Sequence, residues 1–259
     1  MKFKFHKYQG TGNDFIIIDN RDNMVSLTES QINRLCDRKF GIGADGLMLL
    51  ENHKELDFFM RYFNSDGKES TMCGNGGRCL VRFANGLNIT SKEIRFMAID
   101  GKHKAMVNDN KTISLQMNDV TEVNIVNTNY YLNTGSPHYV TFRDDIDKLD
   151  IFNRGREIRY SAEFEPDGTN VNFVEIQNGK IYVRTYERGV ENETLSCGTG
   201  VTASAICASL YSESDKNSYD ILTKGGNLNV SFKKIDKNKY KDIWLTGPAV
   251  FVFEGEIEI

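Results

Sequence analysis

Two stretches of the chain repeat each other and decide the fold: YFNSDGKESTMCGNGGRCLVRFA (62–84) and YERGVENETLSCGTGVTASAICA (186–208). At one constant offset the matched pairs are Tyr62 and Tyr186, Glu69 and Glu193, Cys73 and Cys197, Gly74 and Gly198, and Gly76 and Gly200. Each stretch follows a strand-like run and precedes a helical pattern of small and apolar residues. The offset is close to half of the 259 residues, which predicts two homologous halves with one cysteine each at a loop-to-helix junction.

The rest of the chain has mostly strand-like patterns. Strands are predicted at 3–8, 15–19, 58–63, 113–117 and 181–186, and over several stretches after residue 219. One helix is predicted from the N-cap Thr28 through Lys39, with Ile32, Leu35 and Cys36 on its apolar face. Two further helices are predicted to begin just after Cys73 and Cys197. The class predicted is α/β (α+β), with two pseudo-symmetric, strand-rich halves.

Composition and charge exclude several classes of protein. The chain is 39% hydrophobic and 26% charged, which is typical of a globular protein. A net charge of −4 without a long basic run argues against nucleic acid as a partner. Apolar runs such as 15–18 are far too short to span a membrane, and the start MKFKFHKYQG lacks the apolar segment of a signal peptide. We therefore expect a cytoplasmic protein.

Cysteine usage points to neither a disulfide scaffold nor a metal site. The five cysteines are odd in number, no Cys-x-x-Cys occurs, and the four histidines are scattered. Three cysteines, Cys36, Cys79 and Cys207, are expected to be small buried hydrophobic residues. Cys73 and Cys197 differ from them, because glycine-rich junctions are poor places to build a core.

Each Cys-Gly-x-Gly turn combines a thiol with an anion-binding backbone. Glycines let a ligand approach the main chain closely. The first N–H groups of a helix lack intrahelical partners and favour a carboxylate nearby. The same helix end lowers the pKa of a thiol. Neither loop has the lysine of a phosphate-binding Walker motif, so a carboxylate ligand is the better prediction.

If the two turns face each other, two sulfurs flank the carbon that bears the carboxylate. Like charges oppose each other at close range, so the pair holds about one proton. A thiolate then removes the α-proton from one face while the opposite thiol delivers a proton to the other. Charge on the carbanion spreads into the carboxylate, where the helix ends stabilise it. The sequence therefore predicts inversion of an amino-acid stereocentre, with Cys73 and Cys197 as acid and base.

At these residues the chain resembles the diaminopimelate epimerase family, over nearly its whole length. The stretches that carry the resemblance are KYQGTGNDF (7–15), GIGADG (41–46), NSDG (64–67), MCGNGGRC (72–79), GSPH (135–138), NVNF (170–173), YERG (186–189), CGTG (197–200) and GPA (247–249). The resemblance implies conversion of LL-2,6-diaminoheptanedioate to the meso form, a step of lysine biosynthesis, without a cofactor or metal. It also implies Cys73 and Cys197 as the two thiols.

The resemblance further implies which residues bind the substrate. Backbone groups of Gly74, Asn75, Gly198 and Thr199 would hold the carboxylate of the reacting centre. The side chains that would read the rest of the substrate are those of Asn13, Asn64, Asn170, Glu187 and Arg188. His138 and Glu187 would help orient the thiols or adjust their protonation. Ser136 stands where the family commonly has asparagine, and its shorter hydroxyl is expected to bind more weakly.

The same resemblance implies the architecture. Each half would be a barrel-like sheet around a central helix, with the active site in the cleft between the halves. The halves are placed at 1–117 and 118–248, and the last strand, 249–259, is expected to join the first half. A homodimer is expected by analogy.

Three other functions remain open from sequence. A proline or hydroxyproline racemase also uses two cysteines, but its first motif typically carries histidine where this chain has Asn75. A thiol–disulfide protein would use Cys73 and Cys197 as a regulatory bond. An amino-acid binding module would bind ligand without exchanging the α-proton.

Overall fold

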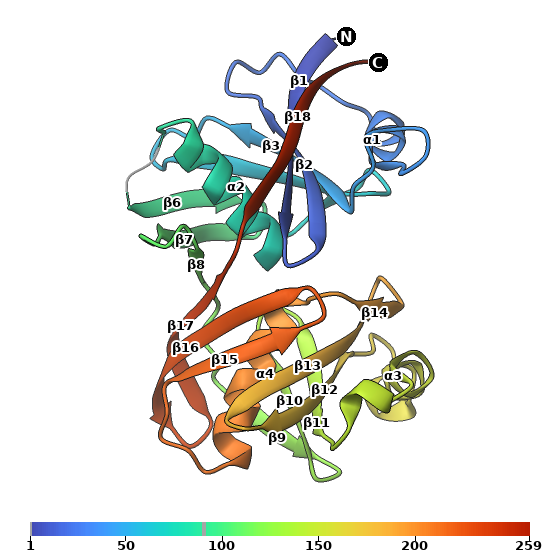
Figure 1. Cartoon of the computed structure of the whole chain (residues 1–259), viewed down its shortest axis with the longest axis vertical. Coiled ribbons are helices and arrows are strands. Elements are labelled where there is room, and N and C mark those ends of the chain that lie inside the picture. The colour runs from blue at the N-terminus through green and yellow to red at the C-terminus, as the bar shows by residue number, and fades with distance from the viewer. Residues whose placement is uncertain (1, 90–91) are drawn as a thin grey trace. The chain divides into compact units, whose positions relative to one another are not determined.

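The computed structural model describes residues 2–89 and 92–259, and this part of the chain holds four α-helices and eighteen strands. Contacts divide the chain into two compact units, one of Met1–Leu115 with Gly247–Ile259 and the other of Gln116–Thr246. In Figure 1 the first unit runs from blue to green and includes the dark red β18. The prediction of an α+β fold with two strand-rich halves is confirmed. Within the described residues, no helix is both long and apolar enough to cross a membrane.

The first unit builds one continuous ladder of strands. Its elements are β1 (Lys2–Gly10), β2 (Asn13–Asp19), α1 (Glu29–Cys36), β3 (Gly46–Glu51), β4 (Phe58–Asn64), β5 (Glu69–Ser70), α2 (Gly74–Gly86), β6 (Glu93–Ala98), β7 (Gly101–Val107), β8 (Ile113–Gln116) and β18 (Val250–Glu258). The pairing runs β18–β1–β2–β3–β4 and then, from the start of β4, through β6, β7 and β8. The short β5 pairs with the end of β4. The β2–β3 and β4–β6 pairs are parallel and the others antiparallel.

The second unit repeats this plan. Its elements are β9 (Val123–Val126), β10 (Asn129–Asn133), β11 (Pro137–Phe142), η1 (Ile146–Lys148), α3 (Ile151–Arg159), η2 (Ala162–Phe164), β12 (Asn170–Gln177), β13 (Lys180–Glu187), β14 (Asn192–Thr194), α4 (Gly198–Tyr211), β15 (Ser218–Thr223), β16 (Gly226–Asp236) and β17 (Lys239–Gly247). The pairing runs β9–β10–β11–β12–β13 and then, from the start of β13, through β15, β16 and β17. The short β14 pairs with the end of β13. Here β11–β12 and β13–β15 are the parallel pairs.

The two ladders have the same order of pairing and the same pattern of parallel and antiparallel neighbours. In each unit a short strand and then a long helix follow the fifth strand of the ladder, which is β4 in the first unit and β13 in the second. β18 pairs with β1 as β9 pairs with β10, so the last strand of the chain completes the first unit. The internal repeat predicted from the cysteine motifs is therefore a repeat of the whole topology.

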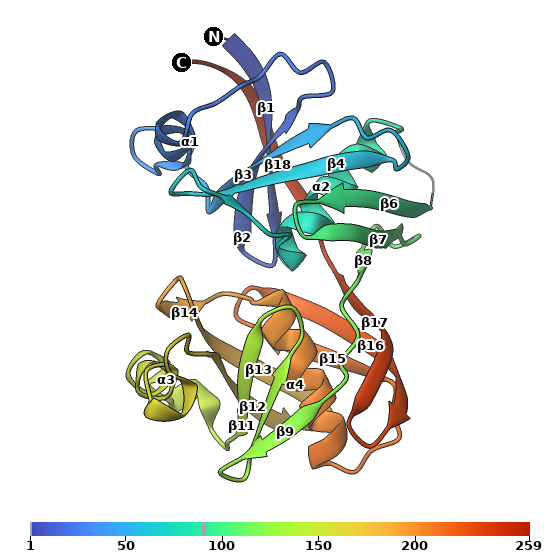
Figure 2. The same cartoon turned by 180° about the vertical axis from the view of Figure 1, so that it is seen from behind.

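The long helix of each unit is its centre. α2 packs against β1, β2, β3 and β7, and α4 packs against β10–β13, β15 and β16. Figures 1 and 2 show the strands of each unit curving around its helix. Neighbouring side chains approach the helix closely at two matched glycines, more closely at Gly200 than at Gly76. A Cβ on Gly76 would lie 3.3 Å from the Met48 sulfur, and one on Gly200 would lie 2.4 Å from Asn172 Oδ1.

The predicted helix after Thr28 is confirmed at its start but not at its end. Thr28 is the N-cap of α1 in a capping box with Gln31. The helix ends at Cys36 rather than Lys39, because Asp37 is extended and its carboxylate accepts hydrogen bonds from the backbone N–H groups of Lys39 and Phe40.

Sequence patterns missed α3 altogether. Only Ile151 and Gly155 are buried in this helix, so it lacks the repeated apolar spacing by which helices are recognised. Its clearest start signal is Asp150, the N-cap, whose carboxylate accepts a hydrogen bond from the backbone N–H of Asn153.

Candidate active site

In the first unit, the start of α2 combines a thiol with the backbone N–H groups of a first helical turn. Cys73 is the N-cap residue, and its side chain makes no capping hydrogen bond. The Gly77 N–H already bonds to the Cys73 carbonyl at 2.7 Å. The N–H groups of Gly74, Asn75 and Gly76 precede it in the first turn, where helices lack intrahelical partners. This end of α2 can therefore receive a carboxylate beside the sulfur.

The Asn13 side chain lies against this thiol. Its Oδ1 is 3.6 Å from Cys73 Sγ and 3.3 Å from Asn75 Nδ2. Its Nδ2 donates to the Asp45 carboxylate at 2.6 Å, which fixes the orientation of the amide. The structure thus brings three of the predicted residues, Asn13, Cys73 and Asn75, into one cluster. Asp45 was not predicted as a site residue, because one acid in a glycine-rich loop looks like a solvated turn residue.

Arg78 is a second residue of this half-site that sequence reasoning missed. Its side chain is fully buried, one turn after the N-terminus of α2. Its acceptors are neutral oxygens, those of Gly74 O, Asn75 Oδ1, Thr11 Oγ1 and Pro248 O. Burial lowers the pKa of Arg78, while the charges that Cys79 and Cys73 carry as thiolates raise it. In the described part of the chain, no carboxylate forms an ion pair with this guanidinium. A helical motif with Arg among small residues gave no signal that the arginine would be buried.

In the second unit, the start of α4 repeats the arrangement with different neighbours. Cys197 is the N-cap residue, again without a side-chain capping bond. Its Sγ lies 3.5 Å from Thr199 Oγ1, which in turn lies 2.9 Å from His138 Nε2. Burial lowers the pKa of His138 to about 3, with a smaller contribution from the Arg188 charge. The ring is therefore neutral at ordinary pH.

A second cluster lies at the strand ends of the same unit. Asn170 donates from Nδ2 to Ser136 Oγ and to the Pro137 carbonyl, each at 2.8 Å. Its Oδ1 accepts the backbone N–H of Arg188 at 2.9 Å. Ser136, predicted as a weak binding residue, is thus held by Asn170. Glu187 is the last residue of β13, beside Arg188.

Within the described residues, the Asn64 side chain forms no hydrogen bond with the group of Asn13, Cys73 and Asn75. It is exposed at the end of β4, and its backbone forms the turn that follows through Gly67 and Lys68. The register places Asn64 opposite Gly46 on β3.

The remaining cysteines are buried, as predicted. Burial raises the pKa of Cys36 and of Cys79 to about 12 and that of Cys207 well above its usual value. All three side chains are nearly or fully enclosed. A thiol with such a pKa stays protonated and unreactive at neutral pH.

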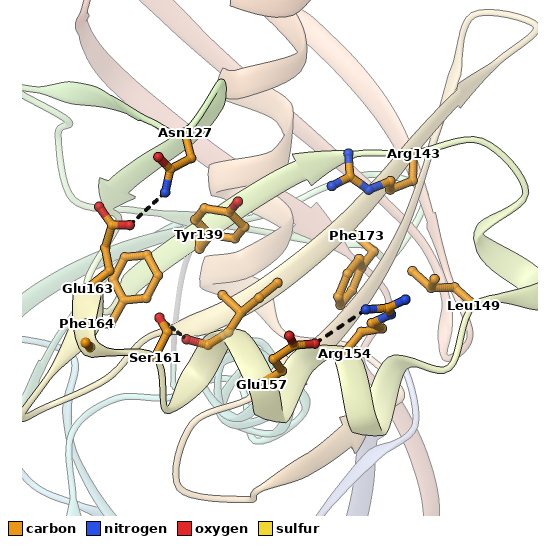
Figure 3. Close-up of a pocket in the computed structure, with 12 residues that line it drawn as sticks. Asn127, Tyr139, Arg143, Leu149, Arg154, Glu157, Ser161, Glu163, Phe164 and Phe173 are labelled. Carbon is orange, nitrogen blue, oxygen red and sulfur yellow. Dashed lines mark hydrogen bonds and ion pairs between the residues drawn. The ribbon is translucent and has the colours of Figure 1, made fainter.

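A cavity of the second unit lies apart from both cysteines. It measures about 710 Å³ and lies between α3 and the strands β11 and β12 (Figure 3). Its charged groups are largely paired with neighbours: Arg154 lies 3.4 Å from Glu157, and Asn127 donates to Glu163 at 2.8 Å. None of the predicted site residues lines it. Its one serine, Ser161, donates its hydroxyl to the Ile158 carbonyl at 2.9 Å, so this cavity does not compete with the cysteine clusters as a catalytic site.

Comparison with solved structures defines the class of fold. A phenazine biosynthesis protein of the PhzF family from Bacillus anthracis matches with a TM-score of 0.74 at 15% identity, with 100% of both chains covered. A probable proline racemase from Agrobacterium radiobacter matches with a TM-score of 0.67 at 12% identity, over 99% of this chain and 93% of the other. At these identities the likeness shows the fold alone: two repeated units of the type that racemases and PhzF proteins share.

Sequence comparison then identifies the family. The model of the diaminopimelate epimerase family matches residues 5–123 and 130–252. A diaminopimelate epimerase from Flavobacterium psychrophilum is 53% identical over 256 residues, which cover 98% of this chain and 100% of that protein. Another from Hydrogenobaculum sp. is 44% identical over 272 residues, with 96% of each chain covered. The chain belongs to the diaminopimelate epimerase family, and the resemblance seen in the motifs is confirmed.

Proposed function

We propose that this chain is an isomerase that converts LL-2,6-diaminoheptanedioate to the meso form in lysine biosynthesis, with no cofactor. Membership of the family supports the reaction and the substrate. One observation supports the chemistry: Cys73 and Cys197 are the N-cap residues of two topologically equivalent central helices. Each sulfur therefore stands beside backbone N–H groups that favour negative charge.

In the proposed reaction, the two thiols act on opposite faces of one α-carbon. One sulfur, as thiolate, takes the α-proton, and the other, as thiol, gives its proton to the opposite face. The carbanion's charge delocalises into the carboxylate held by Gly74 and Asn75 of one helix and by Gly198 and Thr199 of the other. At the end of a turnover the proton has changed sulfur, so the pair still holds one proton. General acid–base placement contributes roughly 10²–10⁴-fold to such a step.

The distal end of the substrate carries a second carboxylate and a second ammonium group. We assign its carboxylate to Arg188, whose planar guanidinium matches a carboxylate, and its ammonium to Glu187. The remaining assigned residues are Asn13, Asn64 and Asn170, with Ser136 as a weaker contact. Asn170 supports this assignment because it joins Ser136 to the backbone of Arg188.

The test is proton exchange in deuterated water. We expect the reduced protein to convert the LL substrate to a meso product that carries one solvent deuterium at the inverted α-carbon. NMR follows the loss of the α-proton signal. Cys73→Ala and Cys197→Ala should each abolish this conversion, whereas Cys36→Ala, a buried thiol, is the matched control. If the α-proton of proline exchanges with solvent and that of diaminopimelate does not, the substrate is that of a proline racemase and the proposed one is wrong. Ligand binding without any exchange would indicate a binding module.

We propose that the protein forms a homodimer through β18. Four consecutive residues of this strand, Val250 to Phe253, are 44–51% exposed although they are apolar. Among the described residues, β18 pairs with β1 alone, which leaves its other edge without a ladder partner. A second copy could cover this apolar edge by antiparallel pairing about a two-fold axis. Sedimentation should show a dimer that Val252→Lys dissociates and that Met24→Lys, at an isolated exposed residue, leaves intact.

We propose the cytoplasm as its compartment, because the reaction that the family's name describes belongs to amino-acid biosynthesis. Cell fractionation followed by an activity assay tests this proposal.

A further inference from the structure

His138 makes a hydrogen bond with each of its ring nitrogens. Its Nε2 is 2.9 Å from Thr199 Oγ1, and its Nδ1 is 3.1 Å from Asn172 Nδ2. The ring is fully buried, so neither nitrogen is solvated. In a neutral ring one nitrogen donates and the other accepts. The partner of Nδ1 therefore decides what Nε2 can do for Thr199.

The orientation of the Asn172 amide is determined by two further contacts. One amide atom lies 3.0 Å from the Tyr139 carbonyl oxygen, which can only accept, so this atom is Nδ2. The other amide atom, Oδ1, accepts the Thr185 hydroxyl at 2.9 Å. Since Nδ2 also faces His138 Nδ1, that ring nitrogen must accept. The imidazole proton is thereby placed on Nε2, which donates to Thr199.

The hydroxyl proton of Thr199 is consequently available for a hydrogen bond to another acceptor. Its Oγ1 accepts from His138, and the acceptor that the structure offers to its proton is Cys197 Sγ at 3.5 Å. In the opposite tautomer, Nε2 would be the acceptor, and the Thr199 hydroxyl would donate its hydrogen bond to Nε2 instead of to the sulfur. Thr199 could then only accept from the sulfur, which favours the thiol over the thiolate.

The first unit lacks this chain of hydrogen bonds. In the parallel ladders His138 pairs with Asn170 as Phe15 pairs with Gly46, so Phe15 and Met48 occupy the places of His138 and Asn172. The packing agrees: a Cβ on Gly76 would meet Phe15 and Met48, and one on Gly200 would meet His138 and Asn172. Two buried polar residues in one half, where the repeat has apolar ones in the other, indicate a role beyond packing.

We propose that Asn172 is a positioning residue that holds His138 as a neutral Nε2–H donor, so that the Thr199 hydroxyl donates to the Cys197 sulfur. This inference rests on the proposed function only in taking Cys197 as an acid/base thiol. It makes His138 a fixed donor rather than a proton carrier.

The charged and titratable groups near this end of α4 are compatible with that role. The Arg188 charge disfavours an imidazolium, and burial disfavours it more strongly. Glu187 is the last residue of β13 and directly precedes Arg188. Cys207 interacts with Tyr130 of β10, and it lies ten residues beyond Cys197, about 15 Å along the helix axis. His138 therefore stays neutral while Cys197 titrates.

The first experiment observes the tautomer directly. In protein labelled with ¹⁵N-histidine, the imidazole correlations of His138 are assigned by their loss in His138→Gln. We expect a neutral Nε2–H ring with no titration between about pH 6 and 9, and a mixture of tautomers in Asn172→Ala. A protonated Nδ1 in the unsubstituted protein, or titration near neutrality, would overturn the proposal.

The second experiment measures the thiol in a Cys73→Ser background, where alkylation of Cys197 is followed against pH. Thr199→Val should move the profile upward by about one pH unit, because the thiolate loses a donor. Thr199→Ser, which keeps the hydroxyl, should restore it. Ser204→Ala removes a hydroxyl of the same helix that bonds to Gly200 O and is the matched control.

If the alkylation profiles of Thr199→Val and Thr199→Ser coincide, the proposed hydrogen bond from Thr199 to the Cys197 sulfur is refuted, even if both variants fold and bind substrate. Neither experiment requires turnover. A failed relay therefore leaves the epimerase assignment standing, and an inactive protein with the expected tautomer would instead count against that assignment.

Discussion

The side-chain amide of Asn13 donates a 2.6 Å hydrogen bond to the carboxylate of Asp45, and this contact turns Asn13 Oδ1 toward Cys73 Sγ. Asp45, on the loop before β3, thus orients Asn13, at the start of β2, against the thiol of Cys73 at the N-cap of α2. The contact belongs to a larger network, because Arg38 bridges Asp45 and Asp14 at 2.7 Å each.

We predict that Asp45→Ala lowers kcat/KM about fivefold, because one hydrogen bond of roughly 1 kcal/mol no longer orients Asn13. Steady-state kinetics with the LL substrate measure the loss, and circular dichroism checks that the fold is retained. Asp109→Ala, at a highly exposed ion pair with Lys92, is the control. Equal kinetics for both variants would show that Asn13 needs no help from Asp45.

Arg78 is predicted to favour the thiolate of Cys73. In a Cys197→Ser background, Arg78→Met should shift the pH profile of Cys73 alkylation upward, because a buried positive charge near the sulfur is lost. Arg78→Lys keeps the charge and should shift it less. Thermal unfolding of both variants separates a folding defect from an electrostatic one. An unchanged profile in folded Arg78→Met would mean that the guanidinium serves only to bind backbone oxygens.

Alkylation should distinguish the five cysteines. In the native protein we expect iodoacetamide to modify Cys73 and Cys197 and to spare Cys36, Cys79 and Cys207, whose burial raises their pKa values. Peptide mass spectrometry gives the extent at each site, and denatured protein should react at all five. Native labelling of Cys79 or Cys207 at the rate of Cys73 would contradict the burial of α2 and α4.

Oxidation should inactivate the enzyme reversibly. If Cys73 and Cys197 work on one carbon, a thiol oxidant such as diamide should join them in a disulfide, and dithiothreitol should restore activity. Mass spectrometry of the non-reduced digest identifies the bond. Full activity with this bond confirmed would end the two-thiol mechanism.

Acid should destabilise the protein partly through His138. The pKa of this ring is about 3 in the folded state and 6.5 for an unperturbed histidine, so between these values the unfolded chain binds more protons. The stabilising contribution is therefore complete above about pH 6.5 and falls as the pH drops toward 3. Urea unfolding should show that His138→Gln reduces the dependence of the unfolding free energy on pH in this window, by up to about 1.4 kcal/mol per pH unit. Parallel curves for the two proteins would show that His138 is not buried as a neutral ring.

Much of the fold and the chemistry was determined by the sequence itself. The repeated Cys-Gly-x-Gly turns predicted two halves and two helix starts, and both cysteines are N-cap residues. These features are local: a loop-to-helix junction, its glycines and the apolar pattern that follows lie within a few residues of each other. The apolar surroundings of Cys36, Cys79 and Cys207 likewise predicted their burial.

Only the tertiary structure decided which polar side chains surround each thiol. Three of these side chains form hydrogen bonds with groups far away in the sequence: Asp45, Arg78 and Asn172. In the sequence each looks like an ordinary turn, helix or strand residue. The two halves also differ where their motifs agree, with Phe15 and Met48 in one and His138 and Asn172 in the other. A hydrogen bond requires that its two atoms are placed to within a few tenths of an ångström. Only the packed sheet brings these groups together with that precision, and no spacing along the chain encodes it.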